Sequence, residues 1–475
     1  MPSESTEPRH DAVVGRSFLK LGSGEALARL IAFGATVYLA RRLGADVYGA
    51  IALATAILLY LACVTDGGLE MLGVSDVARQ PSRIAALLPS ILVGRLGVAV
   101  TLAVLVTAAG LFLLPQPDGA LLSSYALTLG AVAMGTQWVH LGLERPGSVA
   151  LVRVGTELLA ALLIVLLVRG PGDVAAAPLA QVIGQGAGAF IFLRLLPGNA
   201  AALRATLRPD VVVSVFRRSW PLVLHALLGL AVFNSDFLFL RVFRDSASVG
   251  YYAVAYTLVS FFLNLGVSYS MGLLPVLSRL RSVPDDERRL HDSAMAHVFA
   301  GALPVAIGGC LLAHQLIALL FGEGYEPAAI ALQILVWSIP LSLFRNVAQA
   351  VLIAHDRQGQ MLRTVSVAAG VNLVLNLLLI PRWGLAGAAV ATLLTEAARA
   401  IVVLGYSRGA GLPFTSGRRF WRAAVAGAAM GAVLLLARSA PWWVRVALGA
   451  LTYGAVLTLV GGLRFGRGGR PELAV

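Results

Sequence analysis

The chain has 475 residues, of which 58% are hydrophobic and only 13% carry a charge, and its mean hydropathy is +0.82. Water-soluble domains carry a much larger charged fraction, so this composition predicts a polytopic membrane protein and excludes an ordinary soluble enzyme. The net charge of +13 comes almost entirely from arginine, because Lys20 is the only lysine. In a membrane protein this charge indicates topology and contact with membrane lipids, and no nucleic-acid partner is expected.

Apolar runs separated by short loops follow one another along the chain. A spanning helix needs about 20 apolar residues, and about 14 runs are long enough. The sequence therefore predicts an all-α polytopic membrane protein with two six-helix lobes and two further C-terminal helices. The expected segments are a cytoplasmic N-terminal tail (1–20), an N-lobe (21–198), a basic cytoplasmic linker (199–218), a C-lobe (219–406), a C-terminal helix pair (407–463) and a cytoplasmic tail (464–475).

An internal repeat relates the two predicted lobes. Residues Leu39–Thr55 resemble Leu240–Tyr256, and Gly49 falls on Gly250 when the two stretches are aligned. Many transporters are built from such repeats, with the substrate site at the repeat interface. The repeat therefore favours a transporter architecture.

Basic residues are concentrated in alternate loops. Arginines near the cytoplasmic ends of spans set the orientation of a membrane protein, so both termini are expected in the cytoplasm. On that side Asp66–Glu70 forms a polar loop that leads into a short amphipathic segment. In an outer loop, Glu323 is expected to be exposed.

Enzymatic signals are absent from the sequence. No HExxH, GxSxG or GxxxxGKS motif occurs, and no loop is long enough for a separate catalytic domain, so an enzyme is not expected. Cys63 and Cys310 both fall in apolar runs and the seven histidines are scattered, so neither a disulfide framework nor a metal site is predicted.

Ionisable side chains inside the apolar runs indicate functional sites, because a charge at membrane depth is energetically expensive. Residues three or four apart share a helix face and can neutralise each other. Three oppositely charged pairs have this spacing: Glu25 with Arg29, Arg153 with Glu157, and Glu396 with Arg399. These pairs can serve insertion and helix contacts alone, or they can line a cavity.

Asp236, Arg95 and Arg345 have no such local partner, so each must face water or pair with another helix. Polar residues accompany Asp236 at helical spacing: His225 lies on its face of the helix, and the next span carries Asn264 and Ser268 on one face. Such stripes occur both in hydrated cavities and in hydrogen bonds between helices. We favour the cavity for Arg29 and Asp236.

Four stretches resemble a known family: Tyr38–Ala56, Asn234–Leu258, Phe321–Leu335 and Asn372–Ala400. They are similar to the polysaccharide transporter, or oligosaccharide flippase, family of the multidrug/oligosaccharidyl-lipid/polysaccharide exporter superfamily. The resemblance implies two six-helix lobes around a central cavity that opens alternately to each side. It also implies a flippase of the bacterial cytoplasmic (inner) membrane, which moves an undecaprenyl-diphosphate-linked oligosaccharide to the outer leaflet for cell-surface polysaccharide biosynthesis.

Candidate roles follow for the charged residues. Arg29, Arg95 and Arg345 are expected to bind the diphosphate in a cationic cavity, because guanidinium groups bind phosphate oxygens through paired hydrogen bonds. No cofactor is expected beyond a coupling proton or sodium ion. The candidate acids for that ion, or for holding an arginine in the cavity, are Asp236, Glu25 and Glu396, and the polar cavity residues are His225, Asn264 and Ser268.

The expected partners are the lipid-linked oligosaccharide, membrane lipids, and the polymerase and assembly proteins of the same polysaccharide. Two alternatives stay open. An ion-coupled multidrug or organic-cation antiporter of the same superfamily would favour an acidic cavity poor in arginine. A membrane polysaccharide polymerase or ligase would be expected to carry a large outer loop, whereas the outer loops here are short.

Overall fold

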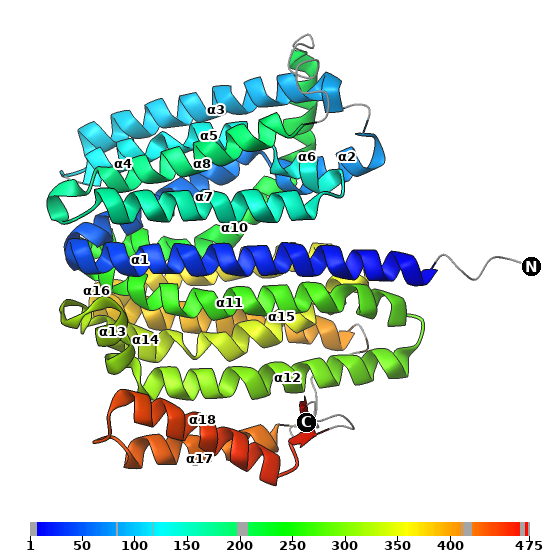
Figure 1. The fold of residues 1–475 in the computed structure, drawn as a ribbon, viewed down its shortest axis with the longest axis vertical. Coiled ribbons are helices and arrows are strands. Elements are labelled where there is room, and N and C mark those ends of the chain that lie inside the picture. The colour runs from blue at the N-terminus through cyan, green and yellow to red at the C-terminus, as the bar shows by residue number, and fades with distance from the viewer. Residues whose placement is uncertain are drawn as a thin grey trace, which may run out of the picture. The chain divides into compact units, whose positions relative to one another are not determined.

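The computed structural model describes residues 7–81, 84–116, 118–196, 208–409, 411, 420–465 and 471–473. Nearly all of them are helical, and a short hairpin pairs β1 (Leu463–Phe465) antiparallel with β2 (Pro471–Leu473) (Figure 1). The predicted all-α class is confirmed. Parts of five predicted segments lie outside the described residues: 1–6, 82–83, 117, 197–207, 410, 412–419, 466–470 and 474–475.

The chain divides into two compact units, residues 1–230 and 231–475, and the division falls inside α10 (Pro209–Phe243). The predicted lobe boundaries stay predictions. The first unit contains α1 (Glu7–Asp66), α2 (Leu69–Arg79), α3 (Ile84–Leu113), α4 (Asp118–Ala126), α5 (Thr128–Met134), α6 (Gln137–Gly142), α7 (Pro146–Leu167), a 3-10 turn (Pro171–Asp173), α8 (Ala176–Arg194) and the start of α10.

A glycine breaks α1 between its two predicted spans. Gly44 has φ 77° and ψ 168°, a conformation that glycine adopts readily because it has no Cβ. The chain therefore turns there without a separate loop. Helix α7 packs along α1, and the Tyr38 hydroxyl on α1 donates a hydrogen bond to the Val168 carbonyl at 2.8 Å, just beyond the end of α7.

Small residues let α7 and α8 approach closely. A Cβ on Gly184 would lie 2.8 Å from the Cβ of Ala160, and one on Gly188 would lie 2.3 Å from Thr156 Oγ1. Larger side chains at these two glycines would force the helices apart. Contacts between small residues are the usual basis of helix packing in membranes.

The second unit continues from α10 to the C-terminal hairpin. In α16, Gly384 has φ 54° and ψ −124°, and the Arg244 guanidinium donates to the Pro381 carbonyl at 3.0 Å beside this break. The helices that follow α10 are α11 (Ser246–Leu280), α12 (Pro284–Leu311), α13 (Ala313–Phe321), a 3-10 turn (Glu323–Tyr325), α14 (Ala328–Leu335), α15 (Ser338–Ala354), α16 (Gln358–Gly409), α17 (Trp421–Leu436) and α18 (Trp442–Leu459).

Within the described residues, 11 helices are long and apolar enough to cross a membrane. Both α1 and α16 contain a glycine break and correspond to two predicted spans each, and α17 is a further, shorter apolar helix. This arrangement matches the about 14 spans predicted from hydropathy. Large apolar side chains such as Phe112 and Leu459 are 86% and 84% exposed, as expected of helices that face lipid.

Candidate functional site

Glu25 joins two arginines on neighbouring helices of the first unit. Its Oε1 accepts from Arg29 Nη2 at 2.8 Å, and its Oε2 accepts from Arg153 Nη1 at 2.9 Å. A Cβ on Gly24 would lie 2.5 Å from the Cβ of Ala150, so the glycine allows α1 and α7 to approach at this level. The side chains of Arg29 and Arg153 remain 44% and 43% exposed, so both guanidinium groups can meet a ligand. We call Arg29 and Arg153, which Glu25 joins, the arginine pair.

The sequence predicted half of the arginine pair. The local pair of Glu25 with Arg29 is confirmed. Arg153, in contrast, makes its direct ion-pair contact with Glu25, while its charge also acts on Glu157 within α7. The reason is the close approach of α1, which brings a carboxylate nearer to Arg153 than helical spacing alone suggests.

Arg95 on α3 is almost completely buried. Its side chain is 2% exposed, and it donates to Asp66 Oδ1 at 3.1 Å. The guanidinium also donates to the carbonyls of Thr65, Val132 and Gly135, at 3.3, 2.8 and 2.9 Å. The last two carbonyls lie at the break between α5 and α6, and that of Val132 accepts from the Gly135 N–H as well. Arg95 therefore ties α1, α3 and α5 together, and its diphosphate-binding role stays a prediction.

Asp236 on α10 is fully buried in a network of neutral donors. Its Oδ2 accepts from Tyr252 and Thr392, both at 2.5 Å, and its Oδ1 accepts from Asn376 Nδ2 at 2.6 Å. Asn376 also donates to Ser235 and Asn372, at 3.2 and 3.0 Å, which extends the network along α16. No arginine is among the hydrogen-bond partners that the described residues offer this carboxylate, so the alternative in which Asp236 holds an arginine is not seen here.

Glu396 forms a second buried network on α16. Its Oε2 accepts from Ser342 at 2.5 Å and from Arg345 Nε at 3.1 Å, and its Oε1 accepts from Arg399 at 2.5 Å. Arg345 also donates to Gln349 at 2.5 Å, and Arg399 lies over the ring of Phe233 at 5.2 Å. The predicted local pair of Glu396 with Arg399 is confirmed. The network carries one carboxylate and two guanidinium groups, all nearly inaccessible, which places Arg345 in an internal ion pair.

Two of the three predicted polar cavity residues bond within their own helix. Asn264 donates to the carbonyl of Ser260 at 2.7 Å, and Ser268 donates to the carbonyl of Asn264 at 3.2 Å, so both bond within α11. Ser268 is exposed and Asn264 is half-buried. His225 on α10 is also half-buried, but it belongs to the first unit, whereas Asp236 belongs to the second.

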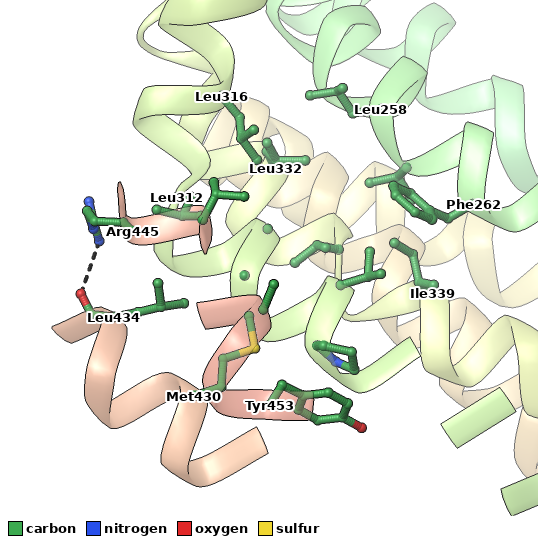
Figure 2. A pocket seen from close by; sticks show the side chains of 18 of the residues that line it. Leu258, Phe262, Leu312, Leu316, Leu332, Ile339, Met430, Leu434, Arg445 and Tyr453 are labelled. Carbon is green, nitrogen blue, oxygen red and sulfur yellow. Dashed lines mark hydrogen bonds between the residues drawn. The ribbon is translucent and has the colours of Figure 1, made fainter. Parts of the chain in front are cut away.

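An apolar pocket of about 580 Å³ lies between the C-terminal helix pair and helices α11, α12 and α14 (Figure 2). Phe262, Leu332 and Met430 are among the side chains that line it, and nearly all of its wall is hydrocarbon. The single cation of the wall is Arg445, which donates to the carbonyls of Leu434 and Leu311 at 3.4 and 3.3 Å. Its Nε has no partner within the part of the chain that the structure describes.

The structure thus brings together side chains that the sequence left separate. Tyr252, Thr392 and Asn376 were not predicted as partners of Asp236, and Ser342 was not predicted as a partner of Glu396. One signal was available, because Thr392 precedes Glu396 by one helical turn and Asn372 precedes Asn376 by the same spacing. That spacing indicates two polar residues on one face of a buried helix.

Two family profiles each match more than half of the chain. One is described as "Polysaccharide biosynthesis protein" and matches residues 14–281, and the other is described as "Lipid II flippase MurJ" and matches residues 158–459. A curated relative, the "Probable flippase AglR" of Haloferax volcanii, is 28% identical over 165 residues, which is 34% of each protein. The match therefore spans about a third of that relative's length.

Solved structures share the fold at low identity. The lipid II flippase MurJ in an inward closed conformation has a TM-score of 0.79 at 13% identity, over 93% of this chain and 98% of that one. An inward-facing multidrug resistance MATE family transporter of the MOP superfamily has a TM-score of 0.62 at 15% identity, over 81% of this chain and 94% of that one. At these identities the likeness establishes the fold alone.

Proposed function

This chain belongs to the polysaccharide biosynthesis protein family and to the lipid II flippase MurJ family, within the MOP superfamily, and on that premise we propose that it flips a lipid-linked oligosaccharide. The cargo is carried on undecaprenyl diphosphate and passes from the cytoplasmic to the outer leaflet by alternating access. The protein works in the bacterial cytoplasmic (inner) membrane with both termini in the cytoplasm. It delivers the lipid-linked oligosaccharide to the polymerase and assembly proteins of a cell-surface polysaccharide.

The arginine pair is the observation that carries this proposal. Two guanidinium groups, of Arg29 and Arg153, stand on either side of one carboxylate and keep donors accessible at membrane depth. Arg29, Arg153 and Glu25 together carry one positive charge, and the acids Glu157 and Glu70 also interact electrostatically with Arg153. Planar guanidinium groups match the oxygens of a diphosphate. A transporter of organic cations would have no use for such a pair. We assign the diphosphate to Arg29 and Arg153, with Glu25 holding them in position.

The apolar pocket supports a cargo with a long hydrocarbon tail. Its volume of about 580 Å³ and its hydrocarbon wall suit part of a polyprenyl chain, which forms no hydrogen bonds of its own. Apolar pockets of this size bind ligands largely through burial of hydrocarbon surface. A saccharide alone would leave such a pocket empty.

Asp236 is the proposed site of the coupling ion. Carboxylate, hydroxyl and amide oxygens are the ligands that hard cations take, and Asp236 has Tyr252, Thr392 and Asn376 around it. The Oδ1 atom of Asn376 has no partner within the described residues, so this amide can offer an oxygen. A proton on the Asp236 carboxyl and a sodium ion between these oxygens are the two candidates, and both neutralise a buried charge.

Deletion of the gene is expected to abolish the surface glycan and to leave its completed diphosphate-linked oligosaccharide on the cytoplasmic side of the membrane. Extraction of lipid-linked saccharides, with and without a membrane-impermeant labelling reagent, measures both the amount and the side. The same extraction identifies the sugar. If the surface glycan and its intermediates are unchanged and sensitivity to cationic drugs rises, the protein is an antiporter of organic cations and the flippase proposal is wrong.

Arg29→Ala and Arg153→Ala are each expected to weaken export strongly while the protein still inserts in the membrane. A hydrogen bond to a charged group contributes about 1.5–3 kcal/mol, so each variant should lower cargo affinity about 10- to 100-fold. Complementation of the deletion strain and a cargo-binding titration on the purified variants measure the effect.

Glu323→Ala is the matched control for these variants. Glu323 is exposed in the 3-10 turn after α13, so its loss should leave export unchanged. Export at the wild-type level by both arginine variants would show that Arg29 and Arg153 do not bind the cargo. A loss of export at Glu323→Ala would move the site to the opposite end of the spans.

A further inference from the structure

A second cavity, of about 270 Å³, lies in the first unit beside α2 and the start of α10. Its floor is apolar, with Leu69, Val77 and Val215, and its rim is polar, with Arg79 and Arg218. Neither the arginine pair nor Asp236 belongs to it. We call this cavity the α2 pocket.

Close packing fixes the wall that α2 provides. A Cβ on Gly73 would lie 2.6 Å from the indole of Trp138, and one on Gly142 would lie 2.5 Å from Cγ1 of Val77. Helix α2 is therefore seated directly on α6, with glycines at the two points of closest approach. The pocket is consequently a preformed feature of the fold and does not depend on the positions of long surface side chains alone.

The rim of the α2 pocket is cationic and only partly neutralised. Arg218 on α10 bonds to Asp76 on α2 with two parallel hydrogen bonds, both of 3.2 Å, and this pairing holds its guanidinium at the rim. The side chain of Arg218 is still 56% exposed, so its remaining donors are accessible. Arg79, one turn after Asp76, is exposed and has no ion-pair partner in the described part of the chain. Two arginines and one aspartate leave one positive charge.

The orientation inferred from the arginines puts α2 at the cytoplasmic surface, where anionic lipid headgroups are concentrated. We propose that the α2 pocket binds the phosphate of an anionic phospholipid of the cytoplasmic leaflet. Arg79 and Arg218 bind the phosphate oxygens, and the apolar floor takes the start of an acyl chain. This site is separate from the proposed flippase activity, and its function would be to anchor α2 at the membrane surface.

Titration of the purified full-length protein with phosphatidylglycerol, followed by native mass spectrometry, tests the proposal. The wild-type protein is expected to retain one phosphatidylglycerol molecule in preference to phosphatidylcholine. The double variant R79Q/R218Q removes two charges near the membrane surface and should bind this lipid about 30-fold more weakly. Asp76→Asn leaves both arginines without a competing acid and should strengthen binding about fivefold.

Arg289→Gln is the control, because Arg289 is 79% exposed on α12 and lies outside the pocket. It should leave the bound lipid unchanged. Equal binding by R79Q/R218Q and wild type, or weaker binding by Asp76→Asn, would overturn the proposal. So would equal retention of phosphatidylcholine.

Competition with inorganic phosphate distinguishes a phospholipid from a soluble phosphate compound as the ligand of the α2 pocket. If the pocket takes a lipid, millimolar phosphate should not displace phosphatidylglycerol, because the acyl chain adds burial of hydrocarbon. Displacement by inorganic phosphate would instead assign the pocket to a soluble phosphate compound and overturn the lipid assignment.

Discussion

Asp236→Asn should abolish ion coupling while the protein accumulates in the membrane as wild type does. Asparagine has the same shape and can still accept from Tyr252 or Thr392, and its amide can donate to Asn376 once that side chain turns its free Oδ1 inward. The fold is therefore preserved, but the carboxylate that takes the ion is gone. Export should fall about 5- to 150-fold, the range that a coupling free energy of about 1–3 kcal/mol spans.

Surface glycan and membrane protein level, measured on the same cells, decide the outcome. Asp245→Asn is the matched control: Asp245 accepts from the Ser248 backbone N–H at 2.8 Å at the start of α11, and asparagine caps helices equally well. Hydrogen bonds from Ser248 hold the pKa of Asp245 below its usual value, so the control also removes an ionised carboxylate. Normal export by Asp236→Asn would show that the coupling ion does not bind at Asp236. Loss of the protein from the membrane would show that Asp236 has a structural role.

Helical periodicity explains why the architecture and some ion pairs were predictable. Spacing of three or four residues fixes which side chains share a face within one helix, and it correctly paired Glu25 with Arg29 and Glu396 with Arg399. Span number followed from length and hydropathy in the same way. The break at Gly44 also falls between two predicted spans, and the break at Gly384 falls at the first residue of another.

Partners on other helices were not predictable for a physical reason. Periodicity says nothing about which neighbouring face a helix meets, and Asp236 bonds to Thr392, 156 residues further along the chain. The case of Arg153 is similar, because Gly24 draws α1 against α7 and supplies Glu25 as a closer partner than Glu157. Arg95 was expected in a hydrated cavity because it has no oppositely charged partner within its own helix. Carbonyls at the break between α5 and α6, together with Asp66, accept its hydrogen bonds instead.

Glu396→Ala should lose the folded protein altogether. The carboxylate is fully buried and is the acceptor that Ser342, Arg345 and Arg399 share. Its removal leaves two guanidinium groups side by side without a counter-charge, and loss of one partner from a buried ion pair costs about 3–5 kcal/mol. That is a large part of the stability of an ordinary domain, about 5–15 kcal/mol. Membrane protein level and the thermal transition of the detergent-solubilised protein measure the loss.

A compensated variant separates the structural role of this network from a functional one. Replacement of all three charges with apolar residues of similar volume (Arg345→Met, Glu396→Leu and Arg399→Met) removes the stranded charges as well, and such replacements in buried networks are often neutral or stabilising. We expect the triple variant to recover its membrane level. Recovery of level without export would show that the arginines act in transport, whereas recovery of both would confine the network to holding α15 and α16 together. Normal stability of Glu396→Ala would mean that water reaches the guanidinium groups of Arg345 and Arg399, which would contradict the burial of this network.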